Sequence, residues 1–355
     1  GVILQVNSEA NLSALSKLSF FEIGGLNHSR KLSIEHRENS FDLDIDDLRD
    51  VWFKTSYLLD KKQSGEEHAT ERFNNYKKQS LQYEFPIEFS GKLSAYNIDI
   101  NRKQTTGTKA AIIREKGVNG DREMAWVMHL AGFDVKDIHM TDLISGSENL
   151  SDVNLVVFVG GFSNSDVLGS AKGWAGAFLY NEKAKEALDN FYSRPDTMSL
   201  GVCNGCQLMM ELGLLYPEMD KHPKMQHNAS GKFESSFVNV TIPEKHNIML
   251  QTLANTRLGV WLAHGEGRFD LPGGEQQYNI VSKYAYEAYP GNPNGSDFDT
   301  AAVSSKDGRH LAIMPHLERS LYPWNWANYP ANRNDEVSPW IEAFVNAKKW
   351  IKDQL

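Results

Sequence analysis

Residues 201–207, with the sequence GVCNGCQ, combine a thiol with the surroundings that make a thiol reactive. The apolar run at 198–202 predicts a buried strand, and residues 207–215 predict a helix. Cys203 would therefore lie at a sharp strand-to-helix turn, where Gly205 gives the backbone clearance. Unpaired amide groups and the positive end of the helix dipole favour a thiolate at such a turn. The same amides can hold an oxyanion formed when the thiolate attacks a carbonyl.

A nucleophilic cysteine needs a base that a third group holds in place. The apolar run at 311–314 predicts a strand, and His316 and Glu318 follow its end. In an extended chain, these two side chains point to the same side. Glu318 could then accept a hydrogen bond from one imidazole nitrogen while the other nitrogen faces Cys203, which is the arrangement of a Cys-His-Glu triad.

Cys203 and Cys206 also form a C-x-x-C pair, a spacing used by thiol redox proteins and by half of many zinc sites. A zinc site would need further ligands nearby, and the chain has no second cysteine pair, so no metal site is expected. A redox role leaves His316 and Glu318 unexplained. We therefore interpret Cys206 as a packing residue of the helix and keep a thiol oxidoreductase as an alternative.

Strands and helices alternate from residue 109 onward, which is typical of a parallel sheet covered on both faces. The pattern predicts strands at 110–114, 135–139, 155–159 and 198–202, and helices at 122–131, 182–192 and 340–351. Active sites of such sheets gather at the carboxyl ends of the strands. Gly160, Gly161, Cys203 and His316 would all lie at such ends.

The first hundred residues differ in pattern from the rest. We expect short strands at 1–6 and 20–23, an amphipathic helix at 45–59 with Trp52 on its apolar side, and a polar helix or linker at 61–79. Residues 90–108 lack a clear period and predict a linker. The expected organisation is a small α+β segment over 1–107 and one large α/β domain over 108–355.

Composition limits the function classes. With 355 residues and 41% apolar content, the chain can bury a large core, and its net charge of −9 argues against a general nucleic-acid binder. No run approaches the ~18 apolar residues of a membrane span, and no signal peptide is visible. Two cysteines in one motif favour a reducing, cytoplasmic setting over a disulfide framework. The chain starts on a strand-like run without methionine, so a fragment of a longer polypeptide is expected.

The pattern G-x-C-x-G-x-Q followed far downstream by H-x-E resembles the class I, triad-type glutamine amidotransferases. Several longer stretches narrow the resemblance to the C-terminal glutaminase domain of the phosphoribosylformylglycinamidine synthase family. They are AIIREKGVN at 111–119, GGFS at 160–163, DVLG at 166–169, GVCNGCQ at 201–207, HGEGR at 264–268, NPNGS at 292–296 and PHLER at 315–319. The resemblance runs from about residue 108 to the end of the chain. Residues before about 107 resemble, more weakly, the tail of the preceding synthetase region.

This resemblance implies a flavodoxin-like, three-layer α/β fold and roles for further residues. The backbone amides of Gly161 and Asn204 would form the oxyanion hole. Gln207 would hydrogen-bond bound L-glutamine, and the loop of His264, Gly265 and Glu266 would help to bind its amino-acid head. A scaffold role for that loop is the alternative.

The implied activity is hydrolysis of L-glutamine to glutamate and ammonia through a cysteine thioester. The ammonia would pass to a synthetase domain of the same enzyme, where ATP and Mg, neither bound by this chain, support conversion of formylglycinamide ribonucleotide in purine biosynthesis. A cysteine hydrolase or peptidase of similar fold, or a scaffold without catalysis, are the other hypotheses. The chain departs from the family pattern at Leu317, Lys232 and Asn164–Ser165, where proline, arginine and Tyr-Gly are usual.

Overall fold

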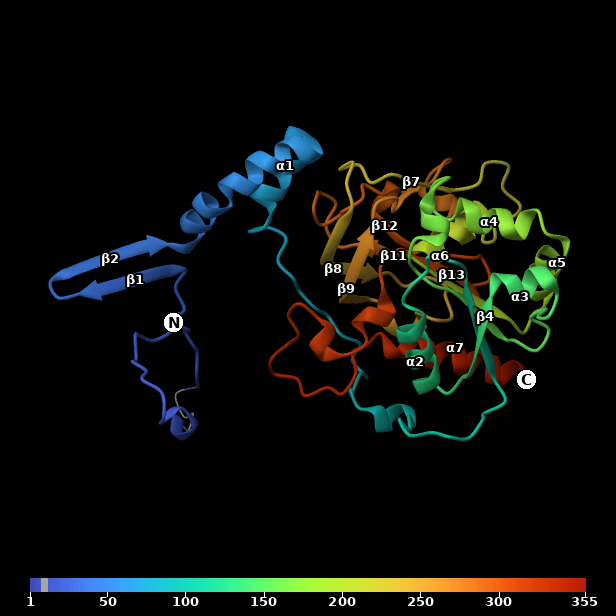
Figure 1. Cartoon of the computed structure of the whole chain (residues 1–355), viewed down its shortest axis with the longest axis horizontal. Coiled ribbons are helices and arrows are strands. Elements are labelled where there is room, and N and C mark those ends of the chain that lie inside the picture. The colour runs from blue at the N-terminus through green and yellow to red at the C-terminus, as the bar shows by residue number, and fades with distance from the viewer. Residues whose placement is uncertain (8–11) are drawn as a thin grey trace. The chain divides into compact units, whose positions relative to one another are not determined.

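Residues 1–7 and 12–355 are described by a computed structural model, and their contacts separate into two units, Gly1–Thr55 and Ser56–Leu355. Figure 1 shows the elements of each unit with their labels. The second unit carries every residue that the sequence singles out for chemistry, so the first is described only briefly.

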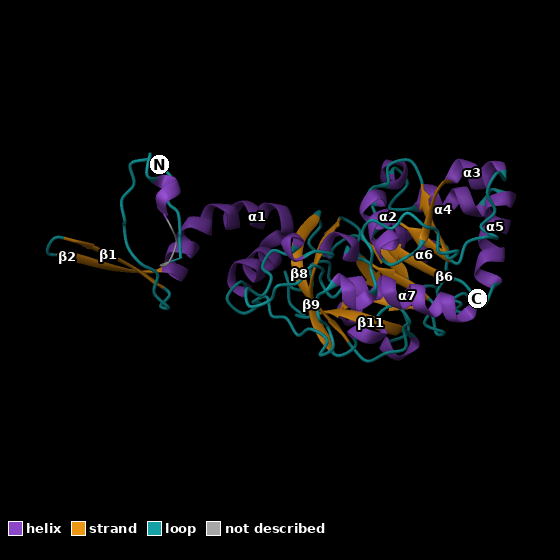
Figure 2. Ribbon diagram, turned by 90° about the horizontal axis from the view of Figure 1, so that it is seen from below, coloured by secondary structure: helices purple, strands orange, loops and turns teal. Residues whose placement is uncertain are grey.

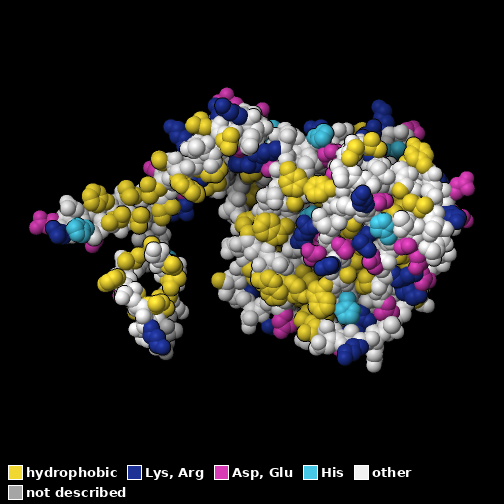
Figure 3. Space-filling model, in the orientation of Figure 1, with side chains coloured by type: hydrophobic (Ala, Val, Ile, Leu, Met, Phe, Trp, Pro, Cys, Tyr) yellow, Lys and Arg dark blue, Asp and Glu magenta, His cyan; other side chains and the backbone are white. Residues whose placement is uncertain are grey.

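The first unit contains a hairpin that the sequence analysis missed. Strands β1 (Lys31–His36) and β2 (Asn39–Asp44) pair antiparallel, with Leu32 opposite Leu43 and Ile34 opposite Phe41. These alternating apolar residues form the cross-strand pairs that stabilise a hairpin, and the row is visible along it in Figure 3. The strands predicted at 1–6 and 20–23 are wrong, since the described residues there form none. A 3-10 helix, η1 (Leu12–Leu15), lies between those segments.

Helix α1 (Ile45–Asn75) joins the two predicted segments at 45–59 and 61–79 into one element. It is kinked at Gly65, whose φ of 82° and ψ of 168° lie outside the helical region. Trp52, expected on the apolar side of this helix, is 83% exposed.

A nine-stranded sheet forms the centre of the second unit, in the order β4-β3-β5-β6-β13-β12-β11-β8-β9. The first five strands are parallel: β3 (Lys109–Arg114), β4 (Asp134–His139), β5 (Leu155–Phe158), β6 (Met198–Val202) and β13 (His310–Ile313). In chain order they read 2-1-3-4-5, which is the flavodoxin-like arrangement. The predicted α/β class is confirmed.

The sequence indicated a parallel sheet, and the structure adds four antiparallel strands to it. They are β12 (Thr300–Ser304), β11 (Asn279–Tyr284), β8 (Glu234–Ile242) and β9 (Thr256–His264). Two short strands, β7 (Lys224–Gln226) and β10 (Arg268–Asp270), pair separately. The sheet is therefore mixed.

Helices cover both faces of the parallel half (Figure 2). They are α2 (Asp121–Leu130), α3 (Met140–Ser145), α4 (Lys172–Leu179), α5 (Glu182–Ser193), α6 (Asn204–Glu211) and α7 (Ile341–Gln354). The step from β3 to β4 runs opposite to the steps from β4 to β5 and β6. Right-handed crossovers therefore put α2 on the other face from α4 and α5. Helix α7 contacts α2, whereas α6 contacts α4.

Short 3-10 helices occupy several loops of the second unit: η2 (Leu93–Tyr96), η3 (Ser163–Asp166), η4 (Gln251–Leu253), η5 (Glu275–Gln277), η6 (Asp297–Asp299), η7 (Leu317–Ser320) and η8 (Pro323–Asn325). An aromatic cluster ties the segment before β3 to the loop around η8. Phe85 packs against Trp326 and Tyr329 with ring centroids 5.7 and 5.5 Å apart. Trp326 is buried in this cluster, whereas Trp324 in the same loop is 73% exposed.

A buried polar group lies at the amino ends of β6 and β13, the edge opposite to Cys203. Nδ1 of His310 is 3.0 Å from the hydroxyl of Ser199, which accepts a hydrogen bond from the Tyr192 hydroxyl at 2.8 Å. Burial, reinforced by the nearby Arg309 guanidinium, lowers the pKa of His310 to about 4. The imidazole is therefore neutral in the folded protein at neutral pH.

This neutral histidine predicts acid sensitivity. Below pH ~6.5, the unfolded chain binds a proton at His310 that the folded chain does not bind until the pH approaches its pKa of about 4. The free energy of unfolding should thus fall as the pH drops through this window, by at most about 1.4 kcal/mol per pH unit for this group. Thermal melts of wild type and His310→Gln from pH 7.5 to 4 measure this loss of stability. The variant should show a shallower decline, and equal slopes would contradict the assignment.

Candidate active site

Cys203 occupies the turn between β6 and α6, with φ 52° and ψ −106°. The residue is 4% exposed. Positive φ is costly for a residue with a side chain and persists only where the surroundings enforce it. Two residues further on, at Gly205, a Cβ would lie 1.9 Å from the carbonyl oxygen of Phe158. Helix α6 thus begins directly against β5, and it starts three residues earlier than the sequence indicated.

His316 and Glu318 lie where the chain leaves β13. The Nδ1 of His316 is 2.7 Å from Oε1 of Glu318, and both side chains are almost fully buried. The chain between them is not extended as expected, because η7 starts at Leu317, yet the carboxylate still reaches the imidazole. Leu317, the residue that replaces the usual proline, is fully buried.

Gly160 brings the imidazole and the thiol together. A Cβ placed on Gly160 would lie 2.7 Å from Cε1 of His316 and 3.4 Å from Cβ of Cys203. Both side chains therefore pack against the same backbone at the carboxyl end of β5. The structure brings Cys203, His316 and Glu318 into one group from two strands of the sheet.

Charges around His316 determine its protonation. Burial alone would lower its pKa, but the Glu318 carboxylate and the Cys203 sulfur outweigh burial and raise it to about 9. The imidazole therefore carries a proton at neutral pH and can donate it to a leaving group.

The second cysteine of the motif, Cys206, is completely buried. Its burial raises the pKa of its thiol well above the usual range and makes it a poor nucleophile.

Two backbone amides lie beside Cys203. Asn204 is the first residue of α6, so its N–H has no acceptor within the helix. Gly161 has φ 121°, and a Cβ there would lie 2.5 Å from Cα of Val118, so only glycine fits. Among the described residues, none accepts a hydrogen bond from the Gly161 N–H.

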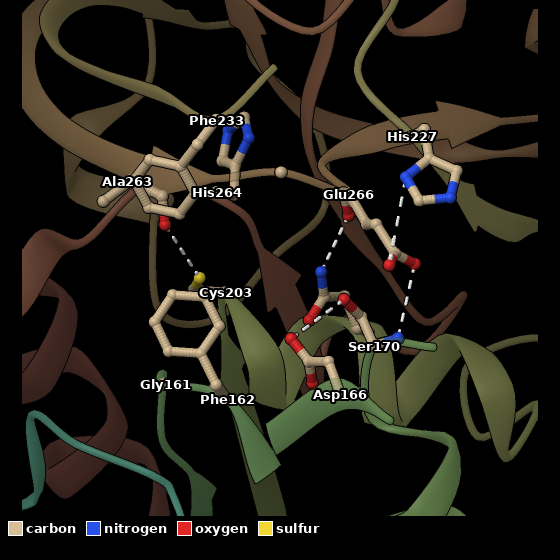
Figure 4. Close-up of a pocket in the computed structure, with 12 residues that line it drawn as sticks. Gly161, Phe162, Asp166, Ser170, Cys203, His227, Phe233, Ala263, His264 and Glu266 are labelled. Carbon is tan, nitrogen blue, oxygen red and sulfur yellow. Dashed lines mark hydrogen bonds and ion pairs between the residues drawn. The ribbon is translucent and has the colours of Figure 1, made fainter. Parts of the chain in front are cut away.

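A cavity of about 230 Å³ opens next to Cys203 (Figure 4). Its lining comprises Gly161, Phe162, Asp166, Ser170, Cys203, Gln207, His227, Phe233, Ala263, His264, Gly265 and Glu266. Six of these were expected from the sequence: Gly161, Cys203, Gln207, His264, Gly265 and Glu266. Asn204, His316 and Glu318 support the site from outside this lining.

Carboxylates line one side of the cavity. Oε2 of Glu266 accepts a hydrogen bond from the Ser170 amide at 3.3 Å, and Nδ1 of the exposed His227 lies 3.9 Å from its Oε1. Asp166 follows Asn164 and Ser165 in a run of three residues with positive φ. Burial and the nearby Glu266 raise its pKa, and its Oδ1 is buried without a hydrogen-bond partner. This side is suited to a cationic ligand group. Sequence reasoning assigned no role to Asp166, Ser170 or His227.

Gln207 lines the cavity through a side chain that is already engaged. Its Oε1 accepts from Asn204 Nδ2 at 2.9 Å, and its Nε2 donates to the carbonyl oxygen of Glu266 at 2.7 Å. Asn204 in turn accepts a hydrogen bond from the Ser163 amide at 3.0 Å. Gln207 therefore connects α6 to the loop that carries Glu266.

His264 is held by a residue that the sequence analysis missed, Asn228. The Oδ1 of Asn228 lies 3.1 Å from His264 Nδ1 and also accepts from the Gly267 amide at 3.0 Å. Burial, with a smaller contribution from the nearby His316, lowers the pKa of His264 to about 3. Its Nε2 is buried and has no hydrogen-bond partner. His264 is a neutral imidazole whose second nitrogen remains available.

The described residues contain no group of three or more His, Cys, Asp and Glu side chains that could hold a metal ion. Among the same residues, no helix combines the length and the apolar character needed to cross a membrane.

These features predict a difference between the two thiols. Iodoacetamide should alkylate Cys203 and leave Cys206 unmodified, because Cys206 is fully buried with a raised pKa. Peptide mapping by mass spectrometry after brief treatment of the folded protein gives the ratio of alkylated Cys203 to alkylated Cys206. Modification of Cys206 at an equal rate would contradict this account, and unfolding in denaturant should make both thiols reactive.

Compared with known proteins, residues 107–351 match the family described as CobB/CobQ-like glutamine amidotransferase domain. A probable phosphoribosylformylglycinamidine synthase of Arabidopsis thaliana, named as chloroplastic/mitochondrial, is 39% identical over 99% of this chain and 27% of that protein. The phosphoribosylformylglycinamidine synthase of Homo sapiens is 39% identical over 86% of this chain and 25% of that protein. The chain thus spans about a quarter of these relatives. They confirm the resemblance drawn from the motifs.

Among solved structures, the one titled PurLQS from Thermotoga maritima aligns with 70% of this chain and 99% of its own. The TM-score is 0.53 at 22% identity, which supports the fold alone.

Proposed function

The chain belongs to the CobB/CobQ-like glutamine amidotransferase domain family, and from this premise we propose that it releases ammonia from L-glutamine through a thioester on Cys203. The observation that carries the proposal is the group formed by Cys203, His316 and Glu318 around Gly160, at the edge of a cavity with a carboxylate side. Residues 108–355 form the glutaminase domain in this proposal.

The first step is attack of the Cys203 sulfur on the side-chain carboxamide carbon of glutamine. The carbonyl oxygen becomes an oxyanion, which the amides of Gly161 and Asn204 are placed to stabilise. Protonated His316 gives its proton to the amide nitrogen, the C–N bond breaks, and ammonia leaves. A thioester between Cys203 and the glutamyl group remains.

The second step is hydrolysis of this thioester. Neutral His316 takes a proton from water, the hydroxide oxygen adds to the thioester carbon, and the C–S bond breaks to give glutamate and the free cysteine. Glu318 orients the imidazole and stabilises its charged form, which the raised pKa of His316 supports. In sum, glutamine and water become glutamate and ammonia.

The amino-acid head of glutamine would bind on the carboxylate side of the cavity. Asp166 and Glu266 are placed to attract its ammonium group, since Oδ1 of Asp166 is buried without a partner. The neutral His264 offers Nε2 as a further acceptor. Gln207 orients the loop of Gly265 and Glu266 through its bond to the Glu266 carbonyl oxygen.

The ammonia would serve a synthetase region outside this chain. Relatives named phosphoribosylformylglycinamidine synthase are about four times as long as the matched part, which supports such a partner. ATP and Mg would act on formylglycinamide ribonucleotide in that region, and no step in this chain uses them. We propose a reducing, cytoplasmic setting, which the two free cysteines support. No observation favours a peptidase or a redox role.

The triad predicts graded losses. Cys203→Ala and His316→Ala should abolish glutamate release, because the first removes the nucleophile and the second the proton donor. Glu318→Gln should keep a measurable remainder, because an orienting group contributes less than groups that bond to the substrate or move its proton. Steady-state glutaminase assays rank the three variants by their residual activity. Wild-type turnover by His316→Ala would refute the assignment.

A separate prediction concerns the complete enzyme. Cys203→Ala in the full-length protein should lose amination that depends on glutamine and retain amination with added ammonium salt, because only ammonia supply uses Cys203. Product formation with each nitrogen source, measured on the same preparation, tests this. Loss of both activities in a folded variant would mean that the domain does more than deliver ammonia.

A further inference from the structure

Phe233 and Phe162 flank the cavity beside the nucleophile. Their ring centroids are 6.0 Å apart, and their side chains are about half exposed. Figure 4 shows the Cys203 sulfur between the two labelled rings in that view. Large apolar rings at this place narrow the access of solvent to the thiol, so the position of Phe233 matters for the site.

The two neighbours of Phe233 in sequence, Lys232 and Glu234, do not line the cavity and bind residues of α1 instead. The ammonium of Lys232 forms a salt bridge with Asp60, and Oε2 of Glu234 accepts a hydrogen bond from Arg72 Nη2 at 2.8 Å. Both neighbours of Phe233 are thus tied to one helix.

Asp60, Arg72, Lys232 and Glu234 form one connected group, called here the four-charge cluster. Arg72 Nε lies 3.7 Å from Asp60 Oδ2, which links the two salt bridges. Tyr289 donates a hydrogen bond to Glu234 Oε1 at 2.7 Å, and the Arg72 guanidinium lies 4.8 Å from the centre of its ring.

The cluster is largely withdrawn from water. The side chains of Asp60 and Glu234 are only 10% and 7% exposed, those of Lys232 and Arg72 20% and 27%. Breaking one pair would therefore leave a poorly solvated charge without its partner.

A kink in α1 at Gly65 separates the two helix residues of the cluster, Asp60 and Arg72. The φ of Gly65 is 82°, which residues other than glycine adopt at a cost.

The same segment is also bonded to the site. Asn228 Nδ2 donates to the carbonyl oxygens of Lys232 at 2.9 Å and His264 at 2.8 Å. Displacement of Lys232 would therefore reach both Phe233 and the loop that begins at His264.

We propose that the four-charge cluster positions Phe233 over the cavity, so that α1 sets how tightly glutamine is held and how far Cys203 is shielded. This inference rests on the glutaminase function proposed above. The cluster residues are positioning residues, since none of them lines the cavity. Their contribution should appear in KM more than in kcat, because Phe233 contacts bound substrate throughout the reaction.

The test compares Lys232→Met with Lys232→Arg in the whole chain, and adds Asp60→Asn and Phe233→Ala. Two rates are measured: glutamine hydrolysis, and alkylation of Cys203 by iodoacetamide, which needs no glutamine. Lys232→Met, Asp60→Asn and Phe233→Ala should raise KM and the alkylation rate at least five-fold. Lys232→Arg should stay within two-fold of wild type, because it keeps the cation that Asp60 accepts.

The matched control is Asp196→Asn, which removes a partly buried ion pair with Arg194 at the amino end of β6. It should cost stability and leave both rates unchanged. Unchanged rates in folded Lys232→Met and Asp60→Asn, or equal effects of Lys232→Met and Lys232→Arg, would overturn the inference. Altered alkylation in a chain whose wild type does not hydrolyse glutamine would instead refute the proposed function and retain the shielding of Cys203.

Discussion

The approach of α6 to the sheet is the constraint on which the site depends. Because the carbonyl oxygen of Phe158 occupies the space that a side chain at residue 205 would need, the helix can begin only with glycine there. The turn at Cys203, which leads into this helix, has a φ of 52°, and the Asn204 amide at the first helical position has no intrahelical partner. The thiol, one candidate oxyanion donor and the start of the helix therefore all lie where α6 packs closely on β5.

Buried charge organises the rest of the site. His316 and Glu318 are both nearly inaccessible, and each is tolerated because the other compensates it. On the far side of the cavity, burial raises the pKa of Asp166, and the nearby Glu266 carboxylate adds to this effect. The ammonium group of the proposed substrate, placed between the two carboxylates, would offset both effects.

The sequence predicts best what depends on local pattern. The five parallel strands and the helices α2, α5 and α7 follow periodic apolar runs, and Cys203, His316 and Glu318 follow a motif. The hairpin at 31–44 also had a period-2 signal, at Leu32, Ile34, Phe41 and Leu43, that went unread. The antiparallel strands β8 and β9 likewise had an unread period-2 signal, at Val238, Val240 and Ile242 and at Leu258, Val260 and Leu262. The contacts of Asn228, Phe162 and Phe233 had no such signal, because they depend on segments distant in sequence. The sequence shows that Lys232 departs from the family pattern, but Asp60, with which it forms a salt bridge, could not be identified without the fold.

The place of β13 in the sheet has a consequence for biosynthesis. This strand lies between β6 and β12, although the chain reaches it only after all the other strands. A chain emerging from the ribosome therefore displays Cys203 at the end of an unpaired β6 edge well before the strand that leads to His316 exists. Until that strand inserts, the thiol lacks the histidine that we propose as its base, so the proposed hydrolysis of glutamine could not begin on a nascent polypeptide. Under this proposal, the topology makes completion of the fold a precondition for the first turnover.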